Sequence, residues 1–218
     1  MGEIPIAIFN VDATKRPASI NTQDKLLAHL GKKTPFRAPV SVFTEVPSKF
    51  FGERIAGAQP DSAHYLEYEF ARYDRTVQVF PSEWNNDVPS GVSKRGKYVY
   101  TPLRVEGQDV LLYTVHLSRR SAAARKREFE LLARSIEKRR PDYNEIVVCG
   151  DFNEQCDRVI DLLAGLDLHA AVQPGDTRTA ASGAIDNLLA SARVGPVQRW
   201  EKSLFSHTPL CVPVLIEK

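Results

Sequence analysis

The 218-residue sequence has three cysteines, no long apolar run and no excess of charge of one sign. The cysteines Cys149, Cys156 and Cys211 are scattered without CxxC spacing, which favours reduced thiols. No apolar run approaches the roughly 18 residues that a membrane span needs. Lys plus Arg number 29 and Asp plus Glu number 27, a formal net charge of +2, which excludes a strongly basic, histone-like nucleic-acid binder. No secretory signal is visible at the start, and with the reduced cysteines this favours a cytoplasmic protein. We expect no membrane partner and see no sign of an obligate protein partner.

The composition is that of a globular protein, with 43% hydrophobic and 26% charged residues. No linker or repeat divides the chain, so we predict a single domain over residues 1–218. Short apolar segments rich in β-branched and aromatic residues predict strands at 4–9, 40–43, 76–80, 98–105, 110–115, 146–149, 185–189 and 210–216. Residues 65–70 alternate between apolar and polar and predict a strand with one wet face.

Helical spacing of apolar residues predicts one helix near residues 21–31, a second over about 121–139, and a weaker third after Asn153. Residues 81–96 are rich in turn formers and predict a long loop. Strands that outnumber the helices indicate an α/β sandwich: two packed, mostly antiparallel β-sheets with helices on the outer faces.

Polar side chains recur at or near the ends of these strands. They are Asn10, Asp12, Glu45, His116, Asp151, Asn153, Asp186 and His207. A single polar residue at a strand end is usually a turn residue, but strand ends can converge at one rim of a sandwich. An oxygen ligand such as Glu45 suits a hard cation such as Mg²⁺, and zinc spacing of His and Cys is absent from the sequence. Asp186 could fix the tautomer of His207, and Asp151 could orient or deprotonate a water.

The order of these residues resembles the motifs of the endonuclease/exonuclease/phosphatase superfamily, to which pancreatic deoxyribonuclease and apurinic endonucleases belong. Gly150-Asp151-Phe152-Asn153 resembles the GDFN signature, and residues 115–118 resemble the THL motif. Similar matches are found at residues 9–12 (the Asn motif), 44–46 (the Glu motif), 185–186 (the ID motif) and 206–210 (the SDHxPV motif). The resemblance covers nearly the whole chain, from residue 4 to about 215.

This resemblance implies a four-layer sandwich with Mg²⁺ or Mn²⁺ held around Glu45. It implies that Asn10 and Asp12 lie beside the metal and the phosphate. Asp151 would align the attacking water and Asn153 would hold a phosphate oxygen. His116 would stabilise the leaving side, while Asp186 supports His207. The family motif carries an Asp before its final His, where this chain has Ser206.

Two basic segments are candidates for substrate contact. Residues 119–140 contain nine Lys or Arg and three Glu, a local balance of +6. They could form a phosphate-tracking surface or, the reading we favour, a solvated helix face. The loop from Trp84 to Lys97 combines an aromatic side chain with the cations Lys94, Arg95 and Lys97, and we expect Trp84, Lys94 and Arg95 to contact substrate. An ordinary surface loop with one half-buried Trp is the alternative.

From these features we expect a divalent-metal-dependent phosphodiesterase, a nuclease that hydrolyses DNA or RNA with Mg²⁺ or Mn²⁺. The fold alone does not name the substrate. Two alternatives stay open. One is a catalytically weakened member that binds nucleic acid or a protein, suggested by Ser206. The other is a phosphomonoesterase, such as an inositol-phosphate phosphatase of the same fold.

Overall fold

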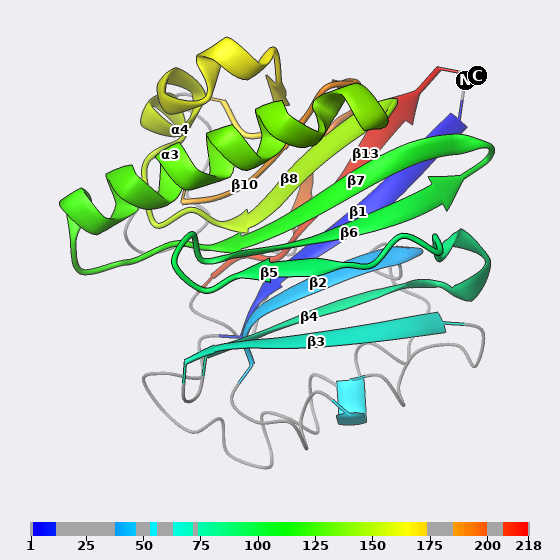
Figure 1. Ribbon diagram of the computed structural model, residues 1–218, viewed down its shortest axis with the longest axis horizontal. Coiled ribbons are helices and arrows are strands. Elements are labelled where there is room, and N and C mark those ends of the chain that lie inside the picture. Colours follow the sequence, from blue (N-terminus) through cyan, green and yellow to red (C-terminus); the bar gives the residue numbers. More distant parts are fainter. Residues whose placement is uncertain are drawn as a thin grey trace.

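A computed structural model describes residues 2–11, 38–46, 53–55, 63–71, 74–173, 185–199 and 207–217. Two β-sheets pack face to face, and two helices cover the outer face of one of them (Figure 1). The helices are α3 (Ala122–Arg139) and α4 (Cys156–Leu162). The described residues also contain the 3₁₀ turns η1 (Ser82–Trp84), η2 (Arg140–Asp142) after α3 and η3 (Ala164–Leu166) after α4. Residues 53–55 are also helical.

The first sheet has the strand order β11-β13-β1-β2-β4-β3, with β12 also paired to β13. Its strands are β1 (Gly2–Asn10), β2 (Val40–Val46), β3 (Ala63–Ala71), β4 (Asp74–Pro81), β11 (Arg193–Val194), β12 (Gln198–Arg199) and β13 (Leu210–Ile216). The second sheet has the order β5-β6-β7-β8-β10-β9. Its strands are β5 (Gly91–Ser93), β6 (Tyr98–Val105), β7 (Gln108–His116), β8 (Glu145–Asp151), β9 (His169–Ala170) and β10 (Asp186–Ala190).

The pairing is mostly antiparallel, with one parallel pair in each sheet. These pairs are β1 with β2, and β7 with β8. A parallel connection needs a crossover of a dozen or more residues, and α3 lies in the crossover between β7 and β8. The sequence-based expectation of two mostly antiparallel sheets is therefore confirmed.

The space between the sheets is filled by every second residue of the inner strands, because side chains alternate between the two faces of a strand. Ile4, Ile6 and Ile8 of β1 pack there, and the rows of β2, β7, β8 and β13 contribute to the same apolar cluster. The other rows face outward. In β7, Leu111, Tyr113 and Val115 pack under α3 and α4 with Phe129 and Leu132 of α3. In the first sheet the outward row forms a third cluster that includes Ile55 of the helical residues 53–55.

A few polar side chains, centred on Gln78, interrupt the apolar space between the sheets. Gln78 of β4 is fully buried and donates from Nε2 to Thr114 Oγ1 of β7 at 2.8 Å. Its Oε1 accepts a hydrogen bond from the hydroxyl of Thr101 in β6. A buried amide is tolerated only where its hydrogen bonds are made, so this contact ties the first sheet to the second.

The strands predicted from the apolar segments are all present, and the predicted helix over about 121–139 is α3. Ser121 caps α3 by accepting a hydrogen bond from Ala124 N, and α4 follows Asn153 as expected. The segment 81–96 is largely irregular but contains η1 and β5. The helix predicted near 21–31 lies outside the described residues. Among the helices of the described ranges, none is long and apolar enough to cross a bilayer.

Candidate active site

The polar residues at the strand ends continue the inward-facing rows of the two sheets. After Ile4, Ile6 and Ile8, the next inward residue of β1 is Asn10. The inward rows of β7, β8 and β10 end in the same way, at His116, Asp151 and Asp186. The strand register places His116 beside Asp151 and Asp151 beside Asp186. Since paired strands lie about 4.8 Å apart, the three side chains form one row at the rim of the second sheet.

Glu45 reaches the rim through an irregularity of β2. The pairing of β2 with β4 shifts register between Phe43 and Val46, and Glu45 has a φ of 55°. In a regular strand Glu45 would point away from Thr44, toward the outer face. A bulge can re-aim a side chain in this way, and positive φ costs a non-glycine residue of order 1–3 kcal/mol.

Asn10 links the carboxylates of the two sheets. Its Nδ2 donates to Asp151 Oδ2 at 2.7 Å and to Glu45 Oε1 at 3.4 Å. All three residues are buried, with exposed fractions of 3% for Asn10, 6% for Glu45 and 1% for Asp151. Two carboxylates therefore face each other across one amide at the end of the sandwich.

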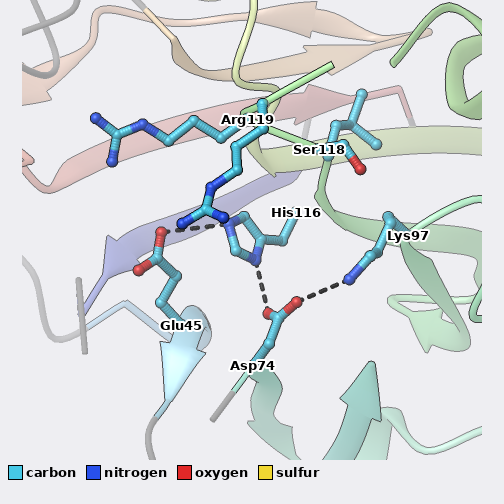
Figure 2. A pocket seen from close by; sticks show the side chains of 8 residues that line it. Glu45, Asp74, Lys97, His116, Ser118 and Arg119 are labelled. Carbon is cyan, nitrogen blue, oxygen red and sulfur yellow. Dashed lines mark hydrogen bonds and ion pairs between the residues drawn. The ribbon is translucent and has the colours of Figure 1, made fainter. Parts of the chain in front are cut away.

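His116 stands between two carboxylates of the first sheet (Figure 2). Its Nδ1 lies 2.7 Å from Asp74 Oδ1 and its Nε2 lies 3.3 Å from Glu45 Oε1. Burial alone would lower the pKa of His116, but the hydrogen bonds to Asp74 and Glu45 raise this pKa well above its usual value. Lys97 Nζ donates to the other oxygen of Asp74 at 2.9 Å. His116 is therefore held as an imidazolium that can donate a proton or a hydrogen bond.

A second pair of the same kind lies on the other side of Asp151. His207 Nδ1 is 2.7 Å from Asp186 Oδ2, and both side chains are buried. Burial acts to lower the pKa of His207, yet the hydrogen bond and charge of Asp186 raise it to about 9. The expected support of His207 by Asp186 is present in this geometry.

Asp151 lies between these two pairs and is buried, with an exposed fraction of 1%. Burial, together with the charge of Asp186, raises the pKa of Asp151 to about 7. Its Oδ1 accepts a hydrogen bond from Asn153 N at 2.7 Å. A carboxylate with a pKa near neutrality can accept a proton from a water.

The turn after Asp151 is shaped by two residues with positive φ. Gly150 has a φ of 126°, and a Cβ there would lie 2.3 Å from the carbonyl oxygen of Val115, so only glycine lets β7 and β8 approach this closely. Asn153 has a φ of 48°, and its Nδ2 donates to Leu117 O at 2.8 Å. The GDFN segment thus fixes the loops after both strands.

The donor set fits a hard divalent cation. Ligand atoms of Glu45, His116 and Asp151 lie within 4.8 Å of one another, and so do those of Asp151, Asp186 and His207. Each histidine shares a proton with a carboxylate, so the oxygens of Glu45 and Asp151 are the groups suited to a cation that prefers oxygen ligands. In the present arrangement Asn10 directs its NH₂ group to both carboxylates, so its amide would have to turn to offer oxygen to a metal.

A cavity of about 490 Å³ opens beside this cluster. It is lined by Glu45, Asp74, Lys97, His116, Leu117, Ser118, Arg119 and Arg120. This volume falls within the range of small-molecule sites. Figure 2 shows Glu45, His116 and Asp74 turned toward one another, with Lys97 on the far side of Asp74.

The structure therefore brings together most of the residues singled out in the sequence. Asn10, Glu45, His116, Asp151, Asp186 and His207 form one cluster, and Asn153 adjoins it. The roles given to them stay predictions. Asp12 and Ser206 lie outside the described residues.

The loop from Trp84 to Lys97, predicted to contact substrate, has its two ends at opposite ends of the second sheet. Trp84 is not near the cluster: its neighbour Asn85 pairs with Leu103, at the other end of β6 from His116, and the apolar indole packs on the core between the sheets. Lys94 and Arg95 are exposed in the turn between β5 and β6. This turn is at the cluster's end of the sheet, because His116 N donates to Lys97 O.

Asp74, which lines the cavity, was missed in the sequence. The other three cavity residues, Lys97, Arg119 and Arg120, belong to the two basic segments considered for substrate contact, but the sequence did not place them beside the cluster. Asp74 begins an inward row whose later members, at 76, 78 and 80, are buried. The alternation along β4 could have revealed it. Nothing local in the sequence indicates that it meets His116, 42 positions away.

Comparison with known proteins supports the fold. No protein-family model matches the sequence, and no curated protein matches it. Solved structures do match. An endonuclease/exonuclease/phosphatase from Bacteroides vulgatus is 12% identical, with all of both chains covered and a TM-score of 0.77. A humanized TDP2 from D. rerio is 14% identical, covering 98% of this chain and 99% of its own, with a TM-score of 0.78.

A mannosyl-6-phosphatase from Bacteroides thetaiotaomicron is also similar. It is 13% identical, with 97% of this chain and 100% of that chain covered and a TM-score of 0.75. At such identities the likeness speaks for the architecture, which matches over whole chains. The protein has the fold of the endonuclease/exonuclease/phosphatase superfamily.

Proposed function

We propose that the protein is a divalent-metal-dependent phosphodiesterase that hydrolyses DNA or RNA. The observation that supports this most is the convergence of Glu45, Asp151 and His207 at one rim, each on a different strand or loop and each buried. Buried carboxylates and imidazolium groups are costly to gather and are typical of catalytic sites. Mg²⁺ or Mn²⁺ held by Glu45 and Asn10 would supply charge that polarises a phosphoryl oxygen.

The protein's own groups divide the remaining work. Asp151 orients a water and accepts its proton, because its carboxylate is the central one of the row. His207, fixed by Asp186 through Nδ1, donates a hydrogen bond to a phosphoryl oxygen from its other ring nitrogen, Nε2. His116, fixed by Asp74, stabilises or protonates the leaving oxygen. Glu45 and Asn10 hold the metal, and Asn153 supports the loops around Asp151.

The experiment is nicking of supercoiled plasmid with Mg²⁺ or Mn²⁺, with EDTA as the metal control. We expect Asp151→Ala and His207→Ala each to reduce the rate by at least about a hundredfold. The matched control is Asp157→Asn, an exposed residue of α4 that removes one carboxylate away from the rim. Unchanged nicking by both alanine variants would exclude this site as its source. A folded wild-type protein that binds DNA or RNA without cleaving it would instead support the non-catalytic alternative suggested by Ser206.

A second candidate function is release of phosphate from a monoester. It is favoured by the similarity to the solved mannosyl-6-phosphatase, which has the same fold over the whole chain. Assaying inorganic phosphate from sugar phosphates and from inositol phosphates, alongside the plasmid assay, separates the two functions. Phosphate release without strand cleavage would replace the first proposal by the second.

A further inference from the structure

Two arginines in the loop after β7 lie on the cavity wall, and neither is ion-paired with a described residue. Arg119 and Arg120 line the cavity beside Glu45 and His116, and both side chains are exposed. Neither guanidinium makes a hydrogen bond or ion pair with any residue of the described ranges. Lys97, the third cation of the cavity, is paired with Asp74 instead. The cavity therefore offers two positive groups to a ligand.

The backbone that carries these arginines is held in place by α3. Glu128 of α3 is buried and accepts hydrogen bonds from Ser118 N at 2.7 Å and from Ser118 Oγ at 2.5 Å. Arg125 of α3 donates to the carbonyl oxygens of Ser118 and Arg119, each at 3.0 Å, and pairs with Glu154. Such fixed backbone reduces the entropy lost when Arg119 and Arg120 bind a ligand.

The remaining cations of the segment 119–140 do not line the cavity. Lys126, Arg127 and Arg134 are exposed along α3, and Arg139 packs on the ring of Tyr100. The structure thus divides the basic segment into two arginines at the site and a helix face for the rest. The favoured interpretation of this segment, a solvated helix face, applies to the helix and not to Arg119 and Arg120.

We propose that Arg119 and Arg120 bind a second phosphate group of the substrate, next to the phosphate that is hydrolysed. The guanidinium fork matches the oxygens of a phosphate and remains charged at any working pH. At about 490 Å³ the cavity is the size of a small-molecule site, so it has room for more than the reacting phosphate. This inference rests on the proposed function. The second phosphate could belong to a polynucleotide backbone or to a small phosphorylated molecule.

The kinetic test uses two substrates that differ by one phosphate. They are thymidine 5′-(p-nitrophenyl phosphate) and the same compound carrying a 3′-phosphate. We expect the wild type to prefer the second substrate in kcat/KM by about 10- to 100-fold, the value of one charge-assisted hydrogen bond. The double variant R119A/R120A is expected to bring this preference to about one. The control R127A/R134A removes the same charge from α3 and should keep the preference. An equal loss of both substrates in R119A/R120A, or no preference in the wild type, overturns the proposal.

A binding experiment in EDTA tests the subsite without catalysis. Fluorescence anisotropy of fluorescein-labelled hexathymidylate should show at least fivefold weaker binding to R119A/R120A than to R127A/R134A, with a smaller salt dependence. Competition by thymidine 3′,5′-bisphosphate and by unlabelled hexathymidylate identifies the source. Stronger competition by hexathymidylate indicates a polynucleotide, and equal competition indicates a small molecule. No binding by the wild type overturns the subsite.

The two proposals can fail separately. Binding that depends on Arg119 and Arg120, without hydrolysis of any substrate, rejects the phosphodiesterase but keeps the subsite. Metal-dependent hydrolysis that is the same in R119A/R120A and in the control, on substrates with one and with two phosphates, rejects the subsite but keeps the phosphodiesterase.

Discussion

Replacing Asp151 by Asn should stabilise the metal-free protein at alkaline pH and destabilise it at acidic pH. In the folded protein the pKa of Asp151 is raised from 3.8 to about 7, mainly by burial and by the neighbouring charge of Asp186. A group with a raised pKa binds its proton more tightly when folded. Its contribution to stability is therefore complete below pH 3.8 and is lost as the pH rises through about 7. Asn has no such dependence.

The size of the effect follows from the same geometry. A shift of about three pKa units corresponds to about 4 kcal/mol between pH 4 and pH 8. Asp151 accepts hydrogen bonds from Asn10 and from Asn153, and an Asn side chain can accept only one of them, at a cost of about 1 kcal/mol. Without metal, Asp151→Asn should thus be about 1 kcal/mol less stable than the wild type at pH 4 and about 3 kcal/mol more stable at pH 8.

The assay is urea denaturation of both proteins at pH 4, 6 and 8 in EDTA, followed by circular dichroism and fluorescence to test for a single transition. Asp157→Asn is the control, because it makes the same Asp-to-Asn change at an exposed position of α4. Mg²⁺ at about a hundred times its Kd should stabilise the wild type by about 3 kcal/mol and the Asp151 variant by much less. A difference between Asp151→Asn and the wild type that stays constant from pH 4 to pH 8 would refute the reasoning.

Three further predictions concern the frame of the site. Glu128→Ala removes two hydrogen bonds to the loop after β7 and should lower the free energy of unfolding by about 2–4 kcal/mol. The control Glu130→Ala, at an exposed position of α3, should change it by less than about 0.5 kcal/mol in the same urea experiment. Gly150→Ala places a Cβ against a backbone carbonyl of β7 at a positive φ and should cost about 2–4 kcal/mol, so a neutral effect on the melting temperature contradicts this packing. Asp74→Asn removes the carboxylate that charges His116, so the pKa of the imidazole, followed by NMR titration, should fall; an unchanged titration would mean that Glu45 alone holds the proton.

Much of the site could be predicted from the sequence because it obeys the alternation of strands. Asn10 continues the row of Ile4, Ile6 and Ile8, and Asp151 continues the row of Val147 and Cys149. A polar residue at the next inward position of an apolar row has to lie at the open end of the sandwich. The order of these residues along the chain also resembles the motifs of the endonuclease/exonuclease/phosphatase superfamily, and the structure shows the fold of that superfamily.

The remaining features depend on contacts that the sequence does not display. Glu45 faces the site only because β2 is irregular, and strict alternation would have turned it outward. Asp74 meets His116 through the packing of two sheets that share no strand. Trp84 was expected to contact substrate because aromatic and basic residues are close in sequence there. In the folded chain its indole packs against the core between the sheets, at the far end of β6 from His116.

The buried amide of Gln78 has a consequence for precision at the reaction centre. If one sheet shifted over the other by one residue, the Gln78 amide would lose its hydrogen bonds while still buried among apolar side chains. This loss would raise the free energy of the folded state by about 1–3 kcal/mol. Gln78 is four residues from Asp74 along β4, about 13 Å, and Thr114 is two residues from His116 along β7. The buried amide therefore fixes the alignment of the two sheets, which are otherwise hydrogen-bonded independently of each other. Through that alignment it sets the relative position of Asp74, from the first sheet, and His116, from the second.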